Sequence, residues 1–185
     1  MPTFVFAHIN HRYLPIDRGE VFEDPLQERL EAEGLGEVTG GGTSQGENGE
    51  IAWIGIDVEI TDVERGLPVV IDTLVAHGAP KGSLLEVHDV DPPRTVPFGG
   101  TEGIAVYLDG VGLPDEVYAT SDINFVVAEV DRLCEGVGRF EAHWQGPTET
   151  ALYVFGRSAD ALQERLAPLL ASYPLCQGAR VVRIA

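Results

Sequence analysis

Hydrophobic and polar residues alternate along the segment 51–60. Every second residue from Ile54 to Ile60 is aliphatic, whereas Trp53 and Asp57 fall on the opposite face. Because successive side chains of a strand point to opposite sides of a sheet, this pattern predicts a strand with one buried face and one mixed face. Shorter strands are predicted in the same way along the rest of the chain.

Helical periodicity, with apolar residues three or four positions apart, predicts four helices between these strands. Asp24 directly precedes Pro25, which is typical of an N-cap followed by the first helical residue, so we expect a loop before Asp24. Thr61 with Glu64 has the spacing of a capping box. The predicted helices span residues 24–33, 62–77, 122–135 and 158–171.

The predicted elements follow the order strand, helix, strand, strand, helix, strand, and this order occurs twice. It is the pattern of the ferredoxin-like fold. We therefore predict an α+β protein of two tandem ferredoxin-like (βαββαβ) halves packed as one compact unit, an internal duplication of architecture. The halves are predicted at residues 1–89 and 102–185, joined by a linker at 90–101 that is rich in Pro and Gly.

The composition limits the classes of partner. The chain has 185 residues, 44% of them hydrophobic, and a net charge of -18 from 30 acidic and 12 basic residues. Because nucleic acid binds through neutralised phosphates, an acidic surface predicts no nucleic-acid partner. We see no membrane-spanning run and no signal peptide, and therefore expect a cytoplasmic protein without a membrane partner. The acidity also fits a salt-adapted or GC-rich source.

The two cysteines, Cys134 and Cys176, are too few for a disulfide framework and lack the spacing of a metal-binding pair. We interpret them as buried thiols in a reducing compartment. His8 and His11 lie near the acidic segment 17–24 and are weak candidates for metal ligands. Their separation of three residues at a strand end matches no metal motif. We therefore expect no metal and no cofactor.

The most plausible contact surface combines a glycine run with an indole and two carboxylates. Glycines leave the backbone accessible, Trp is frequent at the centre of interfaces, and carboxylates favour a basic partner. The alternative is structural, with the glycines forming a bulge and Trp53 packing in the core. The predicted contact residues are Gly40, Gly41, Gly42, Thr43, Trp53, Asp57 and Glu59.

No catalytic motif is present, and the glycine run lacks the Lys and Ser or Thr of a phosphate-binding loop. The sequence therefore favours a non-catalytic module that binds an unknown protein or small molecule. Two alternatives remain open. One is an acidic inhibitor or immunity-type protein that masks a basic partner, and the other is a small enzyme that uses carboxylate and His groups at a cleft between the halves.

Overall fold

The computed structural model describes residues 2–88 and 91–185. Contacts within the chain divide it into two compact units, Met1–Glu47 with Ile51–Gly100 and Asn48–Glu50 with Thr101–Ala185. Within the described ranges, every helix is too short or too polar to cross a bilayer.

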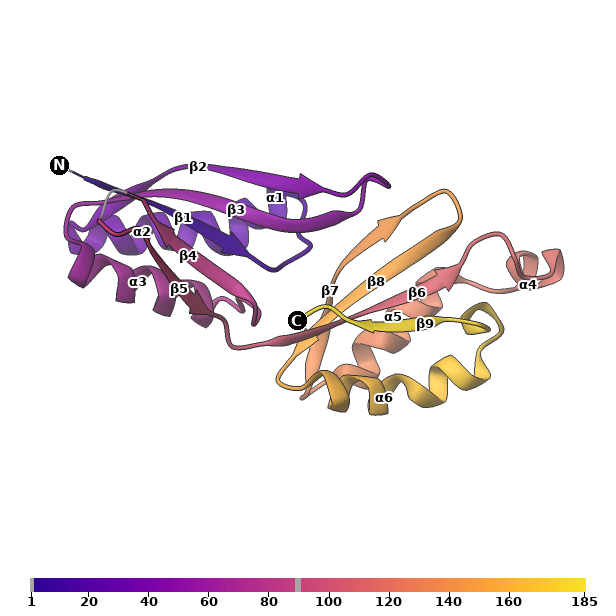
Figure 1. Ribbon diagram of the computed structural model, residues 1–185. Helices are drawn as coiled ribbons and strands as arrows, with labels where there is room; N and C mark the ends of the chain where they lie inside the picture. Colours follow the sequence, from indigo (N-terminus) through magenta and orange to yellow (C-terminus); the bar gives the residue numbers. More distant parts are fainter. Residues whose placement is uncertain (1, 89–90) are drawn as a thin grey trace. The chain divides into compact units, whose positions relative to one another are not determined.

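The first unit contains a five-stranded antiparallel sheet with the strand order β2-β3-β1-β4-β5. Helices α2 and α3 cover one face of this sheet (Figure 1). Buried aliphatic side chains from β1, β3 and β4 form that face. The elements of the unit are β1 (Thr3–Ile9), α1 (Pro15–Arg18), η1 (Gly19–Glu23), α2 (Asp24–Glu33), β2 (Gly36–Gln45), β3 (Ile51–Ile60), α3 (Val63–Ala76), β4 (Ser83–Val87) and β5 (Arg94–Phe98).

The second unit contains a four-stranded antiparallel sheet with the order β7-β8-β6-β9, and α5 and α6 pack against it (Figure 1). Apart from β5, this order repeats that of the first unit, so the predicted α+β fold of two ferredoxin-like halves is confirmed. The packing of the halves as one unit stays a prediction. The elements are β6 (Glu102–Asp109), α4 (Asp115–Thr120), α5 (Ile123–Cys134), β7 (Gly138–Gln145), β8 (Glu149–Gly156), α6 (Ala159–Ser172), η2 (Pro174–Cys176) and β9 (Arg180–Arg183).

The predicted linker at 90–101 is partly a strand. Residues Arg94–Phe98 form β5, which pairs with β4 at the edge of the first sheet. Pro97 is compatible with this position because an edge strand has one side without a neighbour, where a missing N–H costs no ladder hydrogen bond. Residues 89 and 90, at the predicted end of the first half, lie outside the described residues.

Two predicted helix caps are wrong, although both helices begin within one residue of the predicted positions. The backbone of Asp24 is already helical (φ -61°, ψ -50°), because the chain is helical from Pro15 through a π-helical turn into α2. The predicted loop before Asp24 is therefore a helix. The cap of α3 is Asp62, whose carboxylate accepts a hydrogen bond from the Arg65 N–H at 3.2 Å. The Thr61 hydroxyl instead donates to the backbone carbonyl of Leu35, between α2 and β2, at 3.2 Å.

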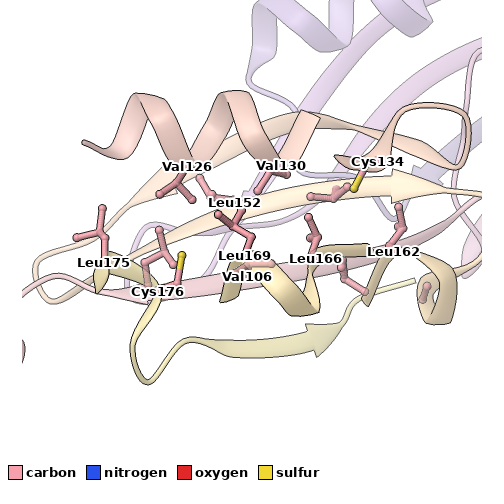
Figure 2. Close-up of a cluster of buried hydrophobic side chains, with 14 residues drawn as sticks. Val106, Val126, Val130, Cys134, Leu152, Leu162, Leu166, Leu169, Leu175 and Cys176 are labelled. Carbon is pink, nitrogen blue, oxygen red and sulfur yellow. The ribbon is translucent and has the colours of Figure 1, made fainter. Parts of the chain in front are cut away.

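Aliphatic side chains from α5, α6 and the sheet form the main core of the second unit (Figure 2). Val126, Val130 and Cys134 project from α5 toward Leu162 and Leu166 of α6 (Figure 2). Both cysteines are free thiols, and burial raises the pKa of each to about 11. At neutral pH both thiols are therefore protonated and act as small apolar side chains.

Two valines of the second unit provide a matched test of this core. Val130 is 0% exposed and Val111 is 63% exposed. We expect Val130→Ala to lower the free energy of unfolding by about 2 kcal/mol, because two buried methyl groups are removed. Val111→Ala should change it by less than about 0.5 kcal/mol. Urea unfolding followed by Trp144 fluorescence in a Trp53→Phe background measures both, and equal losses would contradict the packing described.

Candidate functional site: the open face of the first sheet

The sheet register divides the predicted contact residues between two faces. Gly41 and Thr43 pair with Ile56 and Ile54, whose buried side chains lie on the helix-covered face. The remaining residues lie on the opposite face, which we call the open face. These residues are Gly40, Gly42, Trp53, Asp57 and Glu59.

On the helix-covered face, an ion pair occupies the space beside the glycine run. The Arg18 Nε lies 2.6 Å from Glu23 Oε1, and Arg18 Nη1 donates to Thr43 Oγ1 at 3.0 Å. A Cβ at Gly41 would collide with the Glu23 carboxylate. Gly41 thus leaves room for the ion pair, and Thr43 links the helical segment to β2 through its hydrogen bond. The sequence did not reveal these roles because Arg18 is far from both residues along the chain.

On the open face, a β-bulge interrupts β2 between Val38 and Gly40. Past the bulge Gly40 lies opposite Asp57, and a Cβ at Gly40 would be 3.1 Å from Asp57 Oδ2. The glycine therefore leaves room for the carboxylate. Gly42 has nothing within 4 Å of its Cβ position and leaves backbone uncovered.

Three rings form the centre of the open face. The imidazole of His8 stacks on the Trp53 indole with centroids 4.4 Å apart, and the Phe6 ring meets the same indole edge-on at 6.0 Å. A Cβ at Gly55 would lie 2.5 Å from Phe6 Cζ, so Gly55 provides the space for this cluster. All three rings are half-buried. The alternation along β1 could have identified Phe6 and His8 as neighbours of Trp53.

Carboxylates flank the Phe6 side of the ring cluster. Asp57 on β3 and Glu86 on β4 lie on either side of Phe6, and Glu59 lies opposite Phe4. Glu37 on β2 lies opposite Glu59. Among the described residues of β1 to β5 that point to the open face, none is Lys or Arg. The strand side chains therefore give the open face negative charge, while Arg12, after the end of β1, adds a positive charge that acts on His8.

The two weak metal candidates lie in different environments. Desolvation by burial lowers the pKa of His8, with Glu86 raising it and Arg12 lowering it further. His11 is fully buried after the end of β1, with its ring 3.8 Å from that of Tyr13. Within residues 2–88 and 91–185, no three His, Cys, Asp or Glu side chains are grouped as a metal site would require.

No protein-family model matches the chain, and none of the curated proteins matches it. Among solved structures, a complex of TiaS with its tRNA, AMPCPP and agmatine is similar over 89% of this chain, with 13% identity and a TM-score of 0.35. This chain spans 56% of that one.

An unknown protein from Galdieria sulphuraria is similar over 98% of this chain and 96% of its own, with 11% identity and a TM-score of 0.31. The first two RRM domains of the yeast poly(U)-binding protein cover 98% of this chain and 99% of their own, with 13% identity and a TM-score of 0.26. Likeness of this degree leaves the function to be argued from the geometry of the chain itself.

Two glycines that pair in the sheet, Gly42 and Gly55, provide a matched test of the ring cluster. We expect Gly55→Ala to displace the Phe6 ring, because the added methyl group would overlap it. In a Trp144→Phe background, this should shift the Trp53 fluorescence maximum and near-UV circular dichroism. Gly42→Ala should leave both signals unchanged. Identical spectra for the two variants would contradict the ring geometry.

The lowered pKa of His8 predicts a pH dependence of stability. The unfolded chain takes up the His8 proton near the usual value of 6.5, whereas the folded chain does so only at lower pH. Protonation therefore favours unfolding, and the free energy of unfolding should rise with pH until it levels off above about 6.5. The difference between wild type and His8→Gln across pH 5 to 8 isolates this contribution. NMR titration that places the His8 pKa above 6.5 would contradict it.

Proposed function

We propose that the chain is a non-catalytic binding module and that its open face binds an Arg- and Lys-rich segment of a partner protein. One observation carries the proposal. The half-buried Trp53 indole contacts Phe6 and His8, carboxylates flank Phe6, and the described residues of β1 to β5 on this face include no Lys or Arg.

The open face offers a cation two kinds of attraction. Indole and phenyl rings attract cations through their π electrons, with about 0.5 to 2 kcal/mol per contact. Asp57, Glu59 and Glu86 add charge-assisted hydrogen bonds, which are about twice as strong as neutral ones. Guanidinium combines both because its plane stacks on rings while its edge binds carboxylates. Arginine is therefore the side chain that this face suits best.

The spacing of the carboxylates favours an extended segment over a single small cation. Asp57 and Glu59 are two residues apart on β3, about 7 Å along the strand. Glu86 is two strands away from Asp57, about 10 Å across the sheet. Several basic side chains of one segment could reach these positions together.

Single-stranded RNA is the other partner that an aromatic sheet face suggests, because bases stack on such rings in RRM domains. Phosphates, however, need basic side chains to neutralise them, and the open face carries Asp57, Glu59 and Glu86 instead. A basic protein segment gains from the same carboxylates. An inhibitor of a basic enzyme would be a special case of this function, and a cytoplasmic setting fits the two free thiols.

The chain contains two tryptophans, so Trp144→Phe makes Trp53 fluorescence a direct reporter of the open face. We expect octa-arginine to change this fluorescence saturably and octa-lysine to bind more weakly. A triple variant that combines Asp57→Asn, Glu59→Gln and Glu86→Gln should abolish this fluorescence change. Binding should also weaken steeply with added salt, because the attraction is mainly between exposed charges.

The matched control removes three exposed carboxylates from the helices, by Glu28→Gln, Glu64→Gln and Asp72→Asn. It has the same net charge as the open-face variant and should bind octa-arginine like the parent. Equal loss of affinity in both variants would show a general charge effect and overturn the proposal. Binding without any change in Trp53 fluorescence would overturn it as well.

A further inference from the structure

The second unit contains a pocket of about 420 Å³ at one end of its sheet, on the face that α5 and α6 cover. It lies where β6 and β7 end and β8 begins, beside the first turn of α5. Sites for small molecules in proteins typically measure about 300 to 1,000 Å³ and are mostly apolar with a few polar groups. Apolar side chains form most of the surface of this pocket, which belongs to a different unit from the open face.

The floor of the pocket is a continuation of the core. Leu108, Leu152 and Leu175 are buried members of the core cluster and also line the pocket. Figure 2 shows Leu175 at the end of the cluster marked by Val126, near the start of α5. The core therefore reaches the pocket as an apolar surface, and a ligand that covers it gains hydrophobic free energy.

A β-bulge brings two rings to the same wall of the pocket. β7 shifts register between Phe140 and Ala142, so Phe140 and His143 both lie on the helix-covered face although they are three residues apart. Their partners in the register, Val154 and Leu152, are members of the core. The ring centroids are 6.5 Å apart and the planes are inclined by 22°. A flat ligand can pack against these ring faces and edges.

The described lining of the pocket presents neither a carboxylate nor a Lys or Arg side chain to a ligand. Its one acidic residue, Asp109, lies opposite Glu149 on the face that also carries Tyr107, away from the helices. The Asp109 carboxylate accepts the N–H groups of Val111 at 2.9 Å and Gly112 at 2.7 Å, and neither of these residues lines the pocket. A charged ligand would therefore lose hydration without gaining a countercharge, so the pocket favours an uncharged one.

Three polar side chains lie at the end of β7 and the start of β8. Gln145 and Thr150 pair with each other, and Thr150 also lies opposite the buried Leu108, so both are on the helix-covered face with His143. In the part of the chain that the structure describes, these three side chains make no hydrogen bond with protein groups. A carboxamide, a hydroxyl and a neutral imidazole can each donate and accept. They match a ligand whose edge carries both a donor and an acceptor.

We propose that this pocket binds a small uncharged aromatic amide. The aromatic ring covers the apolar floor beside Phe140, and the amide exchanges hydrogen bonds with Gln145 and Thr150. A primary amide suits Gln145 because two carboxamides can form a pair of hydrogen bonds in which each donates one and accepts one. A ketone of the same shape can only accept, and it leaves the Gln145 carbonyl without a donor.

The test uses the full chain at about pH 8, where a free imidazole is mostly neutral, and four probes of nearly the same shape. These are benzamide, acetophenone, benzoate and benzamidine. We expect benzamide to shift the backbone amide NMR signals of Gln145 and Thr150 saturably, with a dissociation constant of about 1 mM. Acetophenone lacks the N–H donors and should bind about three- to tenfold more weakly. The anionic and cationic probes should also bind more weakly than benzamide, because neither finds a countercharge.

Two variants connect this preference to the polar side chains. Gln145→Met removes the carboxamide and should make benzamide and acetophenone bind about equally, and Thr150→Val should reduce the preference for benzamide. The matched control is Gln163→Met, at an exposed position of α6 outside the pocket, which should preserve the preference. Circular dichroism shows whether each variant is folded. If a pocket variant unfolds, the order of the four probes on the wild-type chain still decides the proposal.

Four outcomes would overturn the proposal. The first is the absence of saturable shifts for benzamide up to about tenfold above the expected dissociation constant. The second is equal binding of acetophenone, which would show an apolar pocket without recognition of the amide. The third is equal or tighter binding of benzoate or benzamidine, which would assign the pocket to a charged ligand. The fourth is a response at Trp53 and Phe6 in place of the pocket amides.

Discussion

Burial of one aliphatic face of β3 is the constraint on which the candidate site depends. Ile54, Ile56, Val58 and Ile60 are all fully buried on the helix-covered face. A shift of one residue in the pairing would turn all four to the opposite side, so the register is strongly fixed. The same register places Trp53 and the carboxylates on the open face. The arrangement of the proposed binding surface is therefore a by-product of forming the core.

Glycines next to aromatic rings recur on both sheets. The Phe6 ring occupies the space above Gly55 in the first unit, and the Phe155 ring lies over Gly103 in the second. In each case a Cβ would overlap the ring. A glycine in a strand lowers stability because it loses more backbone entropy on folding. Here each glycine leaves the space that a large ring occupies.

The sequence predicted the fold better than the site, for physical reasons. Alternation and helical periodicity are local properties, and they were sufficient for the strands and helices of the repeated pattern, but not for α1, α4 and β5. The cap pattern at Asp24 was misleading because the same residues also suit a helix that continues from a preceding turn. Gly41 and Thr43 were grouped with Trp53 because neighbours in sequence were treated as neighbours in space. Which residue of β2 faces which side depends on the bulge after Val38, and that bulge carries no distinct local signal.

The edge strands of the first sheet disfavour self-association of the protein through strand pairing. An unpaired strand edge can recruit another chain through backbone hydrogen bonds, which leads to aggregation. Here one edge is the short strand β5 with Pro97 and its missing donor, and the other is β2, which is bent by a bulge and rich in glycine. Both edges are poor templates for an added strand. The sheet can therefore expose aromatic side chains on one face, where a partner would be recognised by side-chain contacts. Its edges do not at the same time present a backbone that further copies could pair with.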